Sequence, residues 1–429
     1  MRGNQRITFG VELILIEITK ISNGLRIVTE EIPYLRSASV GVWVLAGSRH
    51  EADRDSGIAH FTEHMLFKGT EKRTAADIAY EMDSIGGQIN AYTAKELTCY
   101  YARVLDDHLL TALDILSDMF FNSLFDEDEI EKEKNVILEE ISMCEDTPED
   151  LCHEILHQTI WPNTGLGRNI LGTEETVLSF KRADFDDFIK RNYRAENVVV
   201  SVAGKFDKST VLAEVERLFS VFGGGDAKPR EDEAASYTPG IVSRNKDIEQ
   251  LHICMAFPGV PLGRDEMYAA TAMNTMFGGG MSSRLFQNIR EKHGLVYSIY
   301  STPICYRDSG IFIICAALNP SSVGKAYELI NSEINGFFSN PVTEEILKNT
   351  KEQLKSNLVL GLESTSSRMS ANARAELLMG RIITPNEQLE KIEAISLDNI
   401  YNLAKMIFDA EKRSIAAVGR DCGFLNSVM

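Results

Sequence analysis

The sequence predicts an α+β fold with two homologous domains produced by an internal duplication, each with helices packed on a mainly antiparallel sheet. Strand-like and helix-like segments follow one another in the same order in both halves of the 429-residue chain. A polar stretch at 223–240, rich in glycine and proline, separates the halves. The length agrees with about two or three domains of ordinary size.

The elements of the first half can be taken in order. Strands are expected at 25–28 and 39–45, where apolar and β-branched residues dominate. Apolar residues at helical spacing predict the helices, and the Gly-Gly pair at 86–87 should end the helix at 75–85. The other expected helices cover 108–121, 126–143, 149–160 and 185–193, and the other strands 88–93, 97–104 and 197–203.

The second half repeats this order. At an offset of 210 residues, a predicted strand at 251–255 falls on 41–45, and near the ends of the halves the segments 180–204 and 395–419 correspond at an offset of 215. These correspondences predict an N-terminal extension at 1–18, a first domain at 19–222, a linker at 223–246 and a second domain at 247–429.

The stretch 56–69, S-G-I-A-H-F-T-E-H-M-L-F-K-G, carries the strongest chemical signal. On a helix capped by Ser56, His60 and His64 project from one face a turn apart, and Glu63 lies between them. Two such imidazoles can share a metal ion, and the carboxylate can handle a metal-bound water. The pattern predicts zinc hydrolysis, although two histidines can also reach this spacing by chance.

The second half has no such triad, because Ala270, Met273 and Asn274 occupy the matching positions at the offset of 210. The fold can therefore exist without the metal-binding side chains. Only the first domain is expected to hold a metal.

A catalytic zinc also needs a third protein ligand and an open position. The acidic helix at 126–143 can supply the ligand, since it places Glu133 and Glu140 seven residues apart on one face. Val136 and Ile137 are expected to face the core.

With this helix in place, the sequence resembles the pitrilysin or insulinase family of inverted-motif zinc peptidases. It is most similar to the processing-peptidase branch, which includes the catalytic β subunit of mitochondrial processing peptidase. The resemblance rests on H-x-x-E-H at 60–64 and on V-I-L-E-E at 136–140, where Glu140 follows His64 by 76 residues. Matching motifs also occur at 86–93, 166–172 and 278–286.

The resemblance implies roles for individual residues. His60, His64 and Glu140 would bind one Zn²⁺ per chain, and Glu63 would be the general base. Glu133 would be an acid that steadies a ligand.

Further roles concern the substrate. The second domain would send Arg290 and Tyr297 toward the scissile carbonyl and the developing oxyanion. Without the family, a surface ion pair and a core aromatic are the simpler interpretations. Strand 88–93 resembles an edge strand that binds an extended peptide, with Phe61, Asn90 and Ala91 as substrate-binding residues. An ordinary hairpin strand fits that pattern equally well.

A rival motif lies at 153–157, where His153, Glu154 and His157 form a literal H-E-x-x-H on a predicted helix. Glu174 or Glu175 could be its third ligand, but the glycines between suggest a loop. We interpret this motif as structural.

Composition excludes several classes of protein. A net charge of −19 argues against nucleic acid as a partner, and no apolar run approaches the length of a membrane span. The seven cysteines are scattered and odd in number, which favours reduced thiols in a cytoplasmic compartment of bacterial type. An organelle matrix is the alternative.

Together, these observations predict a zinc-dependent endopeptidase that cleaves extended, unfolded peptides or presequence-like segments, with a preference for nearby basic residues. The family implies a homodimer, with a hetero-oligomer as the alternative. The competing function is a catalytically silent structural subunit of the same fold.

Overall fold

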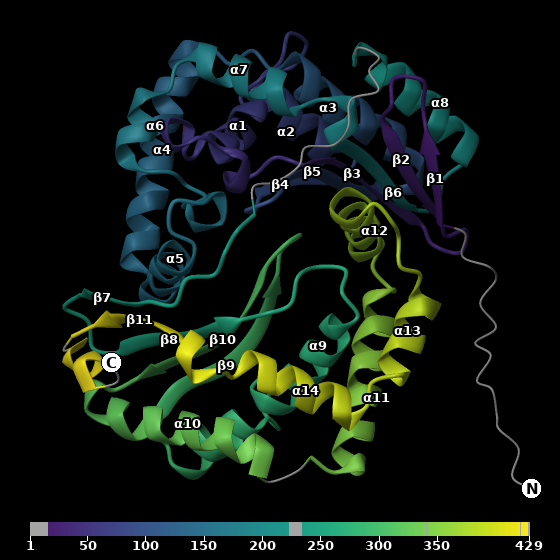
Figure 1. Ribbon diagram of the computed structural model, residues 1–429. Helices are drawn as coiled ribbons and strands as arrows, with labels where there is room; N and C mark the ends of the chain where they lie inside the picture. The colour runs from purple at the N-terminus through teal and green to yellow at the C-terminus, as the bar shows by residue number, and fades with distance from the viewer. Residues whose placement is uncertain (1–15, 223–233, 340–341, 421, 428–429) are drawn as a thin grey trace, which may run out of the picture.

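The computed structural model describes residues 16–222, 234–339, 342–420 and 422–427, which form two α+β halves that face each other (Figure 1). The first sheet has six strands in the order β1-β2-β6-β3-β5-β4, so β4 is an edge strand. Only the β2–β6 pair is parallel. The strands are β1 (Ile16–Lys20), β2 (Arg26–Glu31), β3 (Ser37–Val44), β4 (Gln88–Thr93), β5 (Thr98–Leu105) and β6 (Val198–Gly204).

The second sheet repeats the topology of five of these strands and has no counterpart of β1 among the described residues. Its order is β7-β11-β8-β10-β9, and only the β7–β11 pair is parallel. This order matches β2-β6-β3-β5-β4 of the first sheet, which confirms the predicted α+β fold with two similar halves. The strands are β7 (Ile241–Asn245), β8 (Leu251–Pro258), β9 (Val296–Cys305), β10 (Gly310–Leu318) and β11 (Ser414–Gly419).

Helices follow the strands in a matching order. The first half contains α1 (Ile58–Leu66), α2 (Ala75–Ser84), α3 (Leu109–Asn122), α4 (Glu127–Asp146), α5 (Pro148–Ile160), α6 (Glu174–Ser179), α7 (Arg182–Asn192) and α8 (Lys208–Leu218). The second contains α9 (Glu266–Phe277), the π-helix Phe286–Lys292, α10 (Val323–Ser339), α11 (Glu344–Gly361), α12 (Thr365–Met379), α13 (Pro385–Glu393) and α14 (Leu397–Ile407). No helix in the described segments has the length and apolarity that a membrane crossing needs.

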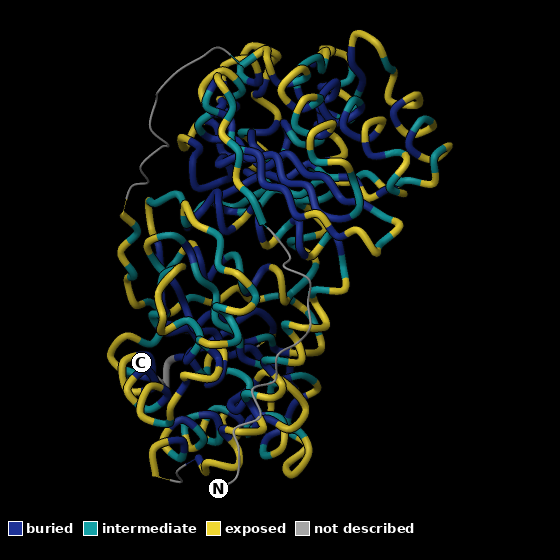
Figure 2. The backbone as a smooth tube through the Cα atoms, turned by 90° about the vertical axis from the view of Figure 1, so that its right-hand side faces the viewer, coloured by how far each residue is buried: buried dark blue, intermediate teal, exposed yellow. Residues whose placement is uncertain are grey.

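One face of each sheet packs on helices of its own half. In the first half, apolar side chains of α1, α3, α7 and α8 meet the strands in a single core, and the strands form a buried band in Figure 2. The second half builds an equivalent core from α9, α10 and α14. This burial supplies most of the stability of such layered folds.

The other face of each sheet is covered by a helix from the opposite half. Met369 and Ala373 of α12 pack on Trp43 and Val199 of the first sheet. Conversely, Leu151 and other apolar residues of α5 pack on β8, β10 and β11 of the second sheet. Figure 1 shows α12 beneath the first sheet and α5 beside the second. The two helices occupy matching places in the repeat, so the exchange is reciprocal.

A buried ionic contact also joins the halves. Arg49 bonds to Glu96 in its own half at 2.7 Å. The same guanidinium forms two 2.7 Å bonds with the carboxylate of Asp308, in the loop between β9 and β10. Only 3% of the Arg49 side chain is exposed, against 31% of Asp308, so the arginine is desolvated while this partner still reaches solvent.

The structure alters three details of the expected organisation. Residues 16–18 of the predicted extension belong to β1, and 1–15 lie outside the described residues. Residues 241–245 of the predicted linker form β7, so the second sheet begins inside it, whereas 223–233 are not described. Val136 does not face the core, because its side chain is 43% exposed while Ile137 is buried.

Candidate metal centre

The helix α1 carries H-x-x-E-H, and its start differs from the expected cap. Gly57, with φ of 94°, occupies the N-cap, and Ser56 does not cap the helix. The buried carboxylate of Glu51 accepts hydrogen bonds from the amides of Gly57 and Ala59, at 2.9 and 2.8 Å. Burial raises the pKa of Glu51 to about 7, even though these hydrogen bonds oppose the rise.

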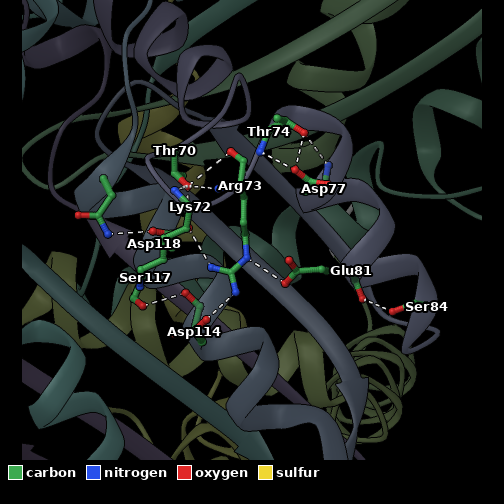
Figure 3. Close-up of polar contacts among 11 residues, drawn as sticks. Thr70, Lys72, Arg73, Thr74, Asp77, Glu81, Ser84, Asp114, Ser117 and Asp118 are labelled. Carbon is green, nitrogen blue, oxygen red and sulfur yellow. Dashed lines mark hydrogen bonds and ion pairs between the residues drawn. The ribbon is translucent and has the colours of Figure 1, made fainter.

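The loop after α1 is fixed by Arg73, as Figure 3 shows. Its guanidinium bonds to Asp118 at 2.8 Å, to Asp114 at 2.6 Å and to Glu81 at 2.9 Å. These carboxylates belong to α3 and α2, so the loop is held against both helices. With Glu51 at one end and Arg73 at the other, α1 has little freedom to shift.

Three donor groups converge between α1 and α4. His60 Nε2 and His64 Nε2 lie 3.2 Å apart, and Glu140 Oε2 lies 3.7 and 3.6 Å from them. Ligand bonds of ~2.0–2.1 Å at a tetrahedral angle separate two donors by about 3.3 Å. Glu140 Oε2 is also buried and finds no hydrogen-bond partner among the described residues. The donor set and its spacing therefore fit one zinc ion.

The second nitrogen of His64 is held by a carboxylate. His64 Nδ1 donates to Glu133 Oε1 at 2.8 Å, which leaves Nε2 directed at the cluster. The other oxygen of Glu133 contacts Lys68 Nζ at 2.5 Å. Burial alone would lower the pKa of His64, but the hydrogen bond with Glu133 and the nearby carboxylates outweigh burial and raise it. Glu133 thus fixes the tautomer in which His64 Nε2 could bind a metal.

His60 has the opposite electrostatic environment. Burial, with a smaller contribution from His64, lowers its pKa to about 3. His60 is therefore neutral at physiological pH, which is the form that binds a metal. Its Nδ1 is buried and has no hydrogen-bond partner in the part of the chain that the structure describes.

Glu63 lies beside the donors and is held from β4. Thr93 Oγ1 donates a 2.5 Å hydrogen bond to Glu63 Oε2. Burial raises the pKa of Glu63, although this hydrogen bond acts against the shift. A cavity of about 370 Å³ opens at this point, lined by His60, Glu63, Ala91, Tyr92, Thr93, Cys144, Asp150, His153, Glu154, Asn169, Ile170 and Leu171.

The predicted substrate-binding residues divide into two groups. Asn90 is exposed and Ala91 half-buried on β4, an edge strand that could pair with an added strand, and the Ala91 amide at present donates to Asn90 Oδ1 at 2.8 Å. Phe61 is wrong for this role. It is fully buried, and its ring packs on Phe180 and Phe185 in the first core.

Arg290 and Tyr297 lie on the second half and do not join the cluster. The guanidinium of Arg290 stacks on Phe286, 4.7 Å from the ring centroid. Tyr297 is 71% exposed on β9, the edge strand of the second sheet. Within the described ranges, neither residue forms a hydrogen bond or ion pair with the metal cluster.

The two histidines of the rival motif point to different partners. His157 Nδ1 donates to the backbone oxygen of His153 at 2.9 Å, and its Nε2 accepts from the Tyr306 hydroxyl at 3.2 Å. Burial lowers the pKa of His157 to about 3. His153 Nε2 faces Tyr300 and Cys315 instead. The H-E-x-x-H at 153–157 therefore forms no zincin-type pair.

Three supporting residues were not singled out from the sequence. Thr93 and Lys68 fall inside matched motifs, so their positions carried a signal that could have been used. The sequence carried no such signal for Glu51, because this residue caps α1 from the segment that precedes the helix. Only the folded chain shows this contact.

Known proteins share both the sequence and the fold that build this centre. Residues 26–174 match "Insulinase (Peptidase family M16)", and 179–354 match "Peptidase M16 inactive domain". The chain belongs to peptidase family M16. A Bacillus subtilis protein called "Uncharacterized zinc protease YmxG" is 43% identical over 388 residues, covering 90% of this chain and 94% of that protein. An "Uncharacterized zinc protease" of Rickettsia felis is 40% identical, covering 92% and 95%.

Solved structures share the fold of this M16 chain. A protease from Helicobacter pylori matches with a TM-score of 0.88 and 20% identity, covering 95% of this chain and all of that one. A chain of Complex III2 from Candida albicans matches with a TM-score of 0.81 and 23% identity, covering 94% and 95%. At these identities the likeness concerns architecture alone.

Proposed function

We propose that this M16 chain is a zinc-dependent endopeptidase that cleaves extended peptides, with His60, His64 and Glu140 as the metal ligands. The observation that carries the proposal is the convergence of these three donors next to Glu63 and the open strand β4. When bound, zinc supplies Lewis-acid chemistry that activates water and polarises a carbonyl. One ion at this centre is sufficient.

Glu63 is the proposed proton carrier. Its carboxylate lines the cavity and is held by Thr93, so it can take a proton from the attacking water. The same oxygen can then deliver that proton to the leaving amine. Glu133 holds His64 in the metal-binding tautomer throughout.

Strand β4 is the proposed peptide-binding element. Its outer edge has no partner strand among the described residues, so a substrate in extended conformation can add to the sheet. Only unfolded segments or short peptides can adopt that conformation. The cavity lining includes Glu63, Asp150 and Glu154 but no described lysine or arginine, which supports a preference for basic residues near the scissile bond.

The second half has a proposed supporting role. Arg290 and Tyr297 would contact the substrate from the second half, either of the same chain or of a second chain. We therefore propose a homodimer in the bacterial cytoplasm, with a hetero-oligomer as the alternative. Size measurement of the purified protein at several concentrations tests this point.

The decisive experiment compares two cavity carboxylates. Glu63→Gln and Glu154→Gln are assayed on a diverse peptide library, with and without a chelator, by mass spectrometry. We expect Glu63→Gln to lose on the order of 10²–10⁴-fold in rate, since general base catalysis is removed. On peptides without basic residues, Glu154→Gln should stay near wild type, because Glu154 pairs with Lys95 at 3.6 Å and does not contact a proposed metal ligand.

Bound zinc is measured in the same samples and should be retained by both variants. Activity that survives in Glu63→Gln and disappears in Glu154→Gln would contradict the assignment. A wild-type protein without chelator-sensitive cleavage would favour the silent structural subunit.

A further inference from the structure

A second cluster of metal-binding side chains lies where the two halves meet. His153 of α5, Cys254 of β8 and Cys315 of β10 place their donor atoms within 4.8 Å of one another. Cys315 Sγ is 3.4 Å from His153 Nε2 and 2.9 Å from Cys254 Sγ. Both cysteines are buried as thiols. None of these residues belongs to the centre on α1.

Sheet register explains the pairing of the thiols. Cys254 and Cys315 are directly opposite in the antiparallel β8–β10 pair, so their side chains leave the same face. That face is the one covered by α5. His153, the first histidine of the rival motif, projects from α5 onto the two sulfurs. The cluster therefore depends on the helix exchange, since neither half alone contains all three residues.

Tyr300 completes the surroundings. Its hydroxyl oxygen lies 3.2 Å from His153 Nε2 and bonds to Glu149 at 2.7 Å. A cavity of about 10 Å³ adjoins the cluster, and Cys254, Tyr300 and Cys315 are among its lining residues. A space of this size is near the minimum that holds a single water. It can admit one ion but no organic ligand.

We propose that His153, Cys254 and Cys315 form a second metal site, which binds a thiophilic divalent ion of the Zn²⁺ type. Two thiolates and one imidazole are a common zinc donor set, with the fourth position left to the Tyr300 oxygen or to water. Zinc at a tetrahedral angle separates an imidazole nitrogen from a sulfur by about 3.6 Å, close to the observed 3.4 Å. Binding releases the two thiol protons.

The distance between the two sulfur atoms can be compared with that expected for a shared zinc ion and with that of a disulfide bond. Two thiolates on one zinc lie about 3.8 Å apart, whereas a disulfide bond is ~2.05 Å long. The observed 2.9 Å lies between these values, so the pair must open to bind an ion or close to form a disulfide. A disulfide would give His153 no role. The presence of its imidazole beside the two sulfur atoms therefore favours a metal site over a disulfide.

Such an ion would connect the halves. His153 comes from the first half and both thiols from the second, so binding would crosslink α5 to the second sheet. This role differs from that of the centre on α1, whose ligands all come from the first half. The expected consequence is greater resistance to unfolding when the metal is bound.

The test uses Co²⁺ as the probe, with a phosphine reductant present. Thiolate-bound cobalt gives an intense near-ultraviolet charge-transfer band, and a site of histidine and carboxylate gives none. We expect the reduced wild type to bind two Co²⁺ per chain and to show this band. Cys315→Ser should bind one Co²⁺ without the band, and His60→Ala should bind one with it. Cys305→Ser, on the neighbouring strand β9, is the matched control and should behave as wild type.

Retained cobalt at the α1 centre shows that Cys315→Ser is folded. In addition, Zn²⁺ should raise the melting temperature of His60→Ala but not that of His60→Ala/Cys315→Ser. Absence of the band in the reduced wild type, or its persistence in Cys315→Ser, would overturn the proposal. A Cys254–Cys315 disulfide that resists the reductant would do the same. The thiolate band and the shift of the melting temperature in His60→Ala report on this cluster alone, whereas the total of two Co²⁺ and the folding control rest on the proposed centre on α1.

Discussion

The hydrogen bond between Glu133 and His64 gives a quantitative prediction for zinc affinity. The carboxylate is buried and accepts from His64 Nδ1 at 2.8 Å. A hydrogen bond to a charged group contributes about 1.5–3 kcal/mol, which corresponds to roughly 10–100-fold in metal affinity. Glu133→Gln should weaken zinc binding about tenfold, because the amide oxygen of the glutamine can still accept a hydrogen bond from His64. Glu133→Ala should weaken zinc binding about a hundredfold, because His64 Nδ1 then loses its hydrogen-bond acceptor.

The assay is competition for zinc with a chromophoric chelator, at constant pH. Glu131→Gln is the matched control, since Glu131 lies less than one turn away on the same helix, is 70% exposed and pairs with Lys134. It should leave the affinity unchanged. If Glu133→Ala binds zinc within twofold of wild type, the carboxylate does not orient the ligand and the reasoning fails.

Two further predictions concern stability. Asp308→Asn removes one of the two carboxylates that contact the buried Arg49. The change should lower the free energy of unfolding, measured by urea titration, by about 1–3 kcal/mol. An unchanged urea midpoint would show that this ion pair does not hold the halves together. Glu51 has its pKa raised from 4.5 to about 7 in the folded protein, so the folded state binds its proton more tightly than the unfolded state. Wild type should therefore lose up to about 3 kcal/mol relative to Glu51→Gln as the pH rises from 4.5 to 7, and parallel stability curves for the two proteins would contradict this.

The sequence could predict that two of the candidate donors lie together because their signal is local. His60 and His64 are one turn apart on a single helix, and helical periodicity alone places them on one face. The same periodicity argues against Phe61 as a substrate contact, since consecutive residues are about 100° apart around a helix. Phe61 is turned into the core while its neighbour His60 faces the cavity.

Contacts between distant segments were beyond the sequence. The helices at 149–160 and 365–379 each cover the sheet of the other half, and no local pattern in the sequence shows this exchange. The cluster of His153, Cys254 and Cys315 was hidden for the same reason. Cys254 and Cys315 are 61 residues apart, and His153 comes from the opposite half. Register and helix exchange bring them together, and neither can be read from spacing.

The reciprocal placement of α5 and α12 bears on how such a chain could arise. Two identical half-length chains that traded one helix would form a symmetric swapped dimer, and a linker at 223–240 would then join them into one polypeptide. A chain cut in that linker should accordingly remain a tight complex of two fragments. Each fragment alone would expose the apolar face that its missing helix covers. In this sense, the protein is an internal dimer that cannot dissociate.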